Sequence, residues 1–308
     1  MKNKLLQKTV YLLLAVFTFA ILFNSCKSGG KEKEEEKETP IEITEVDEEA
    51  LQDVKEAKRI FYSLPSPLES AMLIKSAGAT FNEELLNPTE NTSRYTTSKL
   101  MALNLGIYTC DLSFASLYDQ TQLVIDYMSA AREMADGLGI LDAINKETIN
   151  RLEENINNRE VILDIVSETF LNSNSYLEDN EQPAIASIVL VGGWVEGLYI
   201  ATQLVDLDKF DSNKLVVRII DQKLSIGIML KLLKDNNEHP AVPEIIGQME
   251  ELKVIFDKIN IKTTDIETEI DEATNVTVLK SKVETDMTPE VFKELGRKVE
   301  EIRSSYVK

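Results

Sequence analysis

The chain has 308 residues, and its 33 Lys and Arg against 53 Asp and Glu give a net charge of −20. This excess of negative charge argues against nucleic-acid binding and against a peripheral grip on anionic lipid, because both need basic surfaces. With two cysteines and one histidine, the chain shows no spacing of the kind that holds a metal ion.

The first 25 residues have the pattern of a secretory signal peptide. Three lysines precede the apolar run TVYLLLAVFTFAILF, residues 9–23, and Asn24, Ser25 and Cys26 follow, so that residues 23–26 are FNSC. Because a cysteine stands at the cleavage site, the segment resembles a bacterial lipoprotein signal. The resemblance implies lipid on the Cys26 thiol, removal of residues 1–25 and attachment to the membrane through that lipid. An uncleaved N-terminal anchor is the alternative.

Residues 26–46 are strongly charged, KSGGKEKEEEKETPIEITE from Lys27 onward, and lack apolar periodicity. Such a composition predicts a flexible acidic tether. Lys27 does not resemble the aspartate signal that retains lipoproteins at the inner membrane, so the resemblance implies the outer membrane. The acidic run also weakly resembles export signals that send Bacteroidota lipoproteins to the cell surface. A plain spacer is the alternative, and the side of the membrane stays open.

Residues 47–308 have the apolar periodicity of an all-α domain, a bundle or array of about nine helices. Processing would remove three lysines and no acid, which leaves the mature chain, residues 26–308, at a net charge of −23. We expect a mostly loop segment at 81–94, a polar loop at 172–180 and, within the uncertain stretch 262–288, a short strand or packed loop at 275–279. The expected helices cover residues 47–62, 66–76, 95–118, 121–138, 146–171, 184–205, 213–234 and 244–260, and a last helix begins at Pro289.

The stretch from Ala184 to Val205 carries one charge, Glu196, and apolar residues on every side. A helix of this kind lies in the middle of a fold or in a bilayer. Acidic flanks without excess Lys or Arg favour the buried soluble helix over a membrane span. Glycines inside it cost stability unless a neighbouring helix packs closely. We therefore expect it to cross helix 95–118 near Gly106 and Gly192, with Tyr108 and Trp194 beside the crossing.

The same two segments suggest an internal duplication. LGIYTCDLSFA, residues 105–115, aligns without a gap with VGGWVEGLYIA, residues 191–201, at an offset of 86. Later segments align at slowly growing offsets, as loop insertions would produce. The interpretation is two three-helix units, about 91–172 and 178–262; chance likeness of apolar helices is the alternative.

A candidate ligand pocket comprises Tyr108, Asp111, Trp194, Glu196 and Tyr199. Asp111 and Glu196 are acids in apolar helices, so each must be paired, hydrogen-bonded or neutralised. A polar pocket between the two units, lined by aromatic residues, would explain them. The structural alternative is that tyrosine hydroxyls or an arginine satisfy both acids, from the set Arg94, Arg132 and Arg218. Cys110, in the same helix, is expected to be a core residue.

The lipoprotein signal, the GIYTCDLSFASLYDQTQ segment and the GGWVEGLY segment together resemble uncharacterised helical lipoproteins of Bacteroidota. That resemblance implies no activity and no cofactor. The favoured function is that of a non-enzymatic envelope lipoprotein with a binding or structural role, whose partner would be another envelope protein or a small ligand and not a nucleic acid. The alternative is a hydrolase that uses Asp111 and Glu196 as a carboxylate pair, which requires both acids close together in an open cleft.

Overall fold

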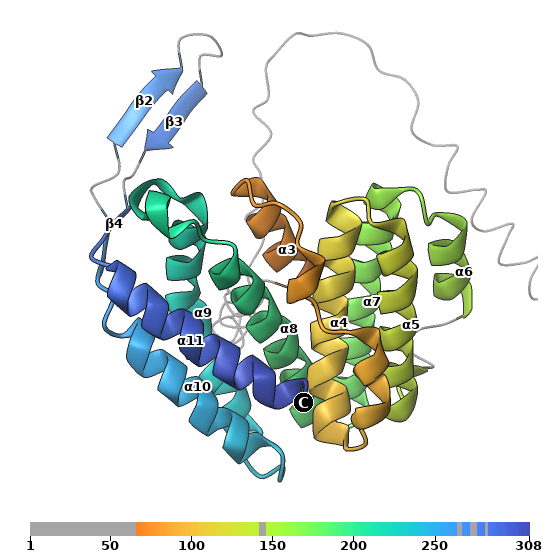
Figure 1. Cartoon of the computed structure of the whole chain (residues 1–308). Helices are drawn as coiled ribbons and strands as arrows, with labels where there is room; N and C mark the ends of the chain where they lie inside the picture. The colour runs from red at the N-terminus through yellow and green to blue at the C-terminus, as the bar shows by residue number, and fades with distance from the viewer. Residues whose placement is uncertain (1–65, 142–145, 264–266, 272–275, 281–282) are drawn as a thin grey trace, which may run out of the picture. The chain divides into compact units, whose positions relative to one another are not determined.

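The computed structural model describes residues 66–141, 146–263, 267–271, 276–280 and 283–308, all within one compact unit, Leu51–Lys308. These residues are predominantly helical, which confirms the all-α prediction (Figure 1). The expected helix at 47–62, the tether and Cys26 lie outside the described residues. The α-helices are α3 (Pro67–Ser76), α4 (Ser98–Leu117), α5 (Thr121–Gly137), α6 (Lys146–Glu154), α7 (Arg159–Asp179), α8 (Pro183–Gln203), α9 (Lys214–Asp235), α10 (Val242–Phe256) and α11 (Pro289–Tyr306).

Local capping explains why several helices begin where the sequence predicts. The Ser66 hydroxyl accepts a hydrogen bond from the Glu69 backbone N–H, and the Glu69 carboxylate accepts one from the Ser66 N–H, which is a capping box. The Thr97 hydroxyl caps α4, and Thr288 caps α11 ahead of a proline at its first position. The segment before α4 forms two short 3-10 helices, η1 (Glu83–Leu85) and η2 (Thr89–Arg94), and a third, η4 (Leu207–Ser212), precedes α9.

The single helix expected at 146–171 is wrong, and so is the loop expected at 172–180. The chain breaks after α6, and α7 then continues without interruption to Asp179. The break lies in the sequence NINN, where Asn155 N–H bonds to the Leu152 carbonyl and Asn158 N–H to the Asn155 carbonyl, as in tight turns. Asparagine favours such local bonds over a continuous helix, and the apolar spacing alone does not reveal this competition.

The uncertain stretch after α10 contains two short antiparallel strand pairs. β1 (Ile261–Thr263) pairs with β4 (Val283–Thr285), and Ile261 lies opposite Thr285. β2 (Glu267–Asp271) pairs with β3 (Val276–Lys280), and Glu267 lies opposite Lys280. The strand alternative considered for 275–279 therefore matches β3, and the helices still define the fold.

Helices α4 and α8 form the centre of the core. Both are long and apolar enough to cross a membrane by length and composition, yet 89% of the apolar window in each is buried inside the protein. Burial of this extent is what an all-round apolar helix needs in the middle of a helical fold.

The two central helices touch backbone to backbone at glycines. A side chain on Gly106 would collide with the Val189 carbonyl, and one on Gly192 would collide with the Leu103 carbonyl. Close approach therefore explains both glycines, as predicted. The contacts are also reciprocal: Gly106 and Gly192, like Leu103 and Val189, differ by the offset of 86 found in the sequence. Two-fold symmetric packing would produce such an exchange, and the duplication itself stays a prediction.

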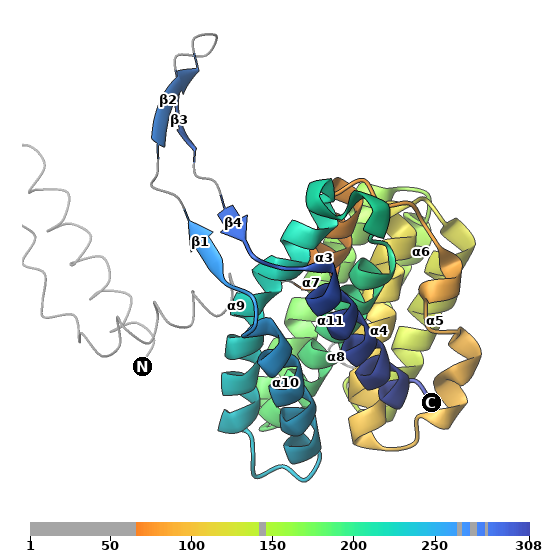
Figure 2. The same ribbon diagram turned by 60° about the vertical axis from the view of Figure 1, so that its left-hand side comes forward.

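Further helices pack on either side of this pair. α5 and α7 pack against α4, while α9 and α11 pack against α8, and α10 lies against α9 and α11 (Figures 1 and 2). α3 covers the crossing, with Pro67 over Gly193 and Ser70 over Gly197. The proposed unit 178–262 contains α8, α9 and α10, as expected for three helices. The proposed unit 91–172 contains α4, α5, α6 and most of α7, so it has four helices and not three, and the expected boundary at 172–178 falls inside α7.

Candidate functional site

The two acids expected to line a pocket are fully buried, and their cationic partner is Arg303. On α8, the Glu196 carboxylate accepts two hydrogen bonds from the Arg303 guanidinium, at 2.9 Å from Nε and 3.0 Å from Nη2. Asp111 of α4 and Glu196 each have 0% exposure. The sequence-based set of arginine partners, Arg94, Arg132 and Arg218, was therefore wrong. We refer to Asp111, Glu196 and Arg303 as the buried charge cluster.

The buried charge cluster holds two carboxyl groups and one guanidinium, and a proton on Asp111 would balance their charges. Burial, with the nearby charge of Glu196, raises the pKa of Asp111 well above its usual range, although Arg303 and a backbone hydrogen bond oppose the shift. Oδ2 accepts the Asn87 N–H at 3.1 Å, whereas Oδ1 has no partner in the described residues while it is unprotonated. A protonated Asp111 can donate to Glu196, which leaves one negative charge to match the guanidinium.

Hydrogen bonds between polar residues around the cluster connect the η1–η2 segment and the end of α11 to α4. The Asn87 side chain donates to Asn104 Oδ1 and to the Tyr95 hydroxyl, each at 3.0 Å. Asn104 in turn donates to the Tyr306 carbonyl at 2.9 Å, and Arg303 donates to the Leu85 carbonyl at 3.1 Å. This arrangement satisfies buried polar groups and fixes long-range contacts, so its role is structural.

The three aromatic residues of the predicted pocket serve different parts of the fold. Tyr199 lies against the Arg303 guanidinium, with 4.7 Å from Cζ to the ring centroid. Tyr108 is fully buried and donates to the Pro88 carbonyl at 3.0 Å. Trp194 Nε1 donates to Gln222 of α9 at 2.9 Å. Two residues along a helix differ by about 200°, so Trp194 faces away from Glu196. The structure therefore does not gather these residues into one pocket.

Cys110, also in α4, is a core residue as predicted. Its side chain is fully buried, and Gly197 of α8 passes close to its sulfur. Burial raises the pKa of the Cys110 thiol well above its usual range, and the charges of Asp111 and Glu196 add to the effect. A thiol of this kind is a poor nucleophile.

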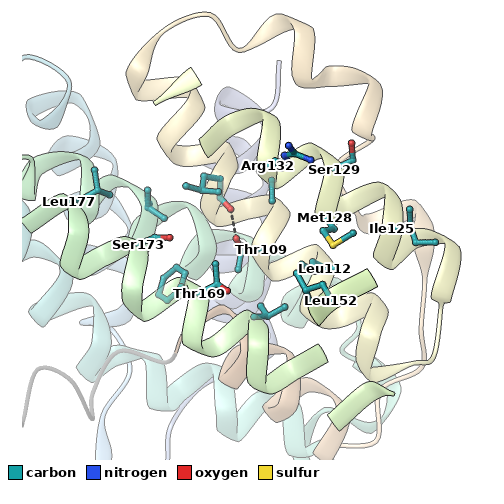
Figure 3. A pocket seen from close by; sticks show the side chains of 15 residues that line it. Thr109, Leu112, Ile125, Met128, Ser129, Arg132, Leu152, Thr169, Ser173 and Leu177 are labelled. Atoms are coloured by element: carbon teal, nitrogen blue, oxygen red, sulfur yellow. Dashed lines mark hydrogen bonds between the residues drawn. The ribbon is translucent and has the colours of Figure 1, made fainter. Parts of the chain in front are cut away.

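A cavity of about 270 Å³ between α4, α5 and α7 is the candidate functional site, and the sequence reasoning did not find it (Figure 3). Its lining is mainly apolar: Leu105, Leu112, Ile125, Met128, Ala131, Leu152, Val166, Phe170, Leu177 and Val189. Ligand sites typically combine such a lining with a few polar groups. The polar lining residues are Thr109, Ser129, Arg132, Thr169 and Ser173.

The polar groups of the cavity differ in how far the protein satisfies them. Thr109 and Thr169 each donate to a carbonyl one turn earlier in their own helix, at 2.7 Å. The Ser173 side chain is 8% exposed, and its hydroxyl has no hydrogen-bond partner among the described residues. Arg132 lies exposed at the rim, and no described carboxylate pairs with it. Ser173 and Arg132 are thus free to bind a ligand.

A sequence signal for this cavity exists in α7. Val166, Phe170, Ser173 and Leu177 follow the three-four spacing of a buried face, and serine interrupts it. A polar residue on such a face needs a partner inside the fold or a ligand. The same reasoning was applied to the acids of α4 and α8, where the partner proved to be an arginine.

The chain matches no family model, no curated protein and no solved structure. Within the described ranges, no group of three or more His, Cys, Asp and Glu residues is placed to hold a metal ion. The geometry of the cavity therefore carries the functional argument.

Proposed function

We propose that this protein is a lipid-anchored envelope lipoprotein of the outer membrane whose helical domain binds a small apolar ligand without chemical conversion. The observation that carries the proposal is the cavity between α4, α5 and α7, whose lining is mainly apolar with a few polar residues. The anchoring part rests on the lipoprotein-like signal around Cys26 and its acidic tether.

The size of the cavity limits the ligand. An apolar cavity of about 150 Å³ accommodates benzene, so in proportion about 270 Å³ has room for roughly eleven carbon atoms. A medium-length acyl chain or a bicyclic compound meets this limit.

The carboxylate-pair hydrolase is the weaker proposal. Asp111 and Glu196 lie close enough to influence each other's charge, but both are fully buried and Glu196 is held by Arg303. Hydrolysis needs access for both substrate and water to such a pair. Binding in the cavity needs no rearrangement of the core.

A cavity-filling substitution tests the binding function. In the processed chain, residues 26–308 with Cys26→Ser so that no acyl chain competes, Ser173→Phe should occupy much of the cavity. We expect calorimetric titration with 1-decanol to show binding by the parent chain and at least a tenfold loss in the Ser173→Phe variant. Because the added ring would gain apolar contacts with the cavity lining, the variant should be at least as stable as its parent. A tightly packed site would instead lose about 1–3 kcal/mol, and that result, or no binding by the parent, would contradict the proposal.

A further inference from the structure

We infer that the ligand of the α4–α5–α7 cavity is a single-chain amphiphile with an anionic head group, which pairs with Arg132. This inference rests on the proposed binding function and names the ligand class. It follows from the charges, the polar groups and the shape of the lining.

The charged side chain that lines the cavity is positive. Arg132 is the single basic residue of the lining, and among the described residues no acidic side chain lines the cavity. Arg151 pairs with Glu168 and Arg159 with Asp119, whereas no ion pair between described residues involves Arg132. The exposed Arg94 and Arg297 also lack such a pair, but neither of them lines the cavity. A guanidinium with free donors pairs well with a carboxylate or a phosphate.

The net charge of the whole chain does not remove this preference. Fields from distant acidic residues are screened beyond about 8 Å at physiological ionic strength. A head group in direct contact with Arg132 experiences mainly that contact.

The lining is mainly apolar at both ends. Figure 3 shows Leu112, Ile125, Met128 and Leu152 towards one side of the cavity and Leu177 beside Ser173 towards the other, with Thr109 between them and Arg132 at one edge. An acyl chain fits against this lining. A head group on the α5 edge would reach the solvent-exposed guanidinium, so the charge of the ligand would remain hydrated in part.

One chain fits and two do not. Room for roughly eleven carbon atoms accepts a chain such as that of dodecanoate, whereas the paired chains of a bilayer phospholipid exceed it. The ligand is therefore a free fatty carboxylate or a lipid with one acyl chain, which share an anionic head and a single tail.

The test compares ligands with and without charge on the processed chain. We would titrate dodecanoate, 1-dodecanol and lauroyl-lysophosphatidylglycerol, each below its micelle concentration, into the parent, Arg132→Gln and Arg297→Gln. Arg297 is an exposed arginine of α11 that does not line the cavity, so it controls for the change in net charge.

We expect the parent to bind dodecanoate about twofold to fivefold more tightly than dodecanol, the range that one solvent-exposed ion pair provides. Arg132→Gln should remove this difference without changing the affinity for dodecanol, and Arg297→Gln should retain it. Binding of the lysolipid as well would support single-chain lipids as the source, and its exclusion would support free fatty acids. If dodecanol binds as tightly as dodecanoate, or if Arg132→Gln has no effect, the inference is overturned while the proposed binding function stands. If no ligand binds the parent, the proposed function itself fails.

Discussion

Replacing Arg303 with methionine tests whether the buried charge cluster holds α11 in place. Methionine retains much of the aliphatic length but removes the guanidinium. Glu196, which is fully buried, then loses both of its hydrogen bonds from Arg303. The Leu85 carbonyl also loses the hydrogen bond that Arg303 donates to it. Tyr199 loses the cation that lies 4.7 Å from its ring centroid.

The expected loss of stability is large. Removing one partner of a buried ion pair costs about 3–5 kcal/mol, because the remaining charge stays desolvated. The lost cation–π contact adds about 1 kcal/mol. A total near 5 kcal/mol is a substantial share of the 5–15 kcal/mol that typically stabilises a folded domain. For a unit of this size it corresponds to a melting temperature lowered by roughly 10–20 °C.

Urea and thermal unfolding, followed by far-ultraviolet circular dichroism, would measure this effect. Arg297→Met is the matched control, because Arg297 is exposed on the same helix, and its cost should stay within about 0.5 kcal/mol. The double variant Glu196→Gln with Arg303→Met should recover part of the loss, since no charge is then left unpaired. Equal stability of Arg303→Met and Arg297→Met, or strict additivity in the double variant, would refute the reasoning.

Three further predictions concern other parts of the chain. The raised native pKa of Asp111 means that folding takes up a proton, so the linked stability is full below the unfolded pKa near 4 and is lost as the pH rises through the native value. The free energy of unfolding of Asp111→Asn should therefore rise relative to that of wild type by up to about 1.4 kcal/mol per pH unit above pH 4. If the unfolding free energies of the two proteins change in parallel with pH, the prediction is wrong. Gly193→Leu should cost about 3 kcal/mol in thermal melts, because even its Cβ would lie 2.8 Å from Pro67 Cγ, whereas Gly227→Leu, with open space at the same atom, should not destabilise. Cys26→Ala should yield a precursor without acyl label; labelling at the wild-type level would show that lipid is attached elsewhere.

Much of the helical order follows from the sequence, because apolar spacing and capping residues are local. The glycine crossing was also predictable, since glycines inside an apolar helix require a close neighbour. The break within NINN was missed because Ile149, Ile156 and Leu163 maintain the spacing of one continuous helix across it. The spacing records which residues are apolar, and says little about a local competition for backbone hydrogen bonds.

The candidate site was less predictable for a different reason. Acidic residues in the apolar helices α4 and α8 indicate that each acid needs a partner. The identity of the partner could not be predicted, because Glu196 and Arg303 are 107 residues apart in the sequence. The cavity depends on the distance between three helices, which no single helix encodes. The position of Ser173 and Arg132 in one cavity lining can be recognised when the helices are packed together.

The contacts between α4 and α11 have a consequence for how the protein is made. Asn104 bonds to the Tyr306 carbonyl across 202 residues of chain. At a synthesis rate of about 5–20 residues per second, α4 waits roughly 10–40 seconds on the ribosome before that partner has been polymerised. During this time one of the most apolar helices of the chain lacks part of its cover. The nascent polypeptide would remain a substrate for holdase chaperones until the last turn of α11 arrives.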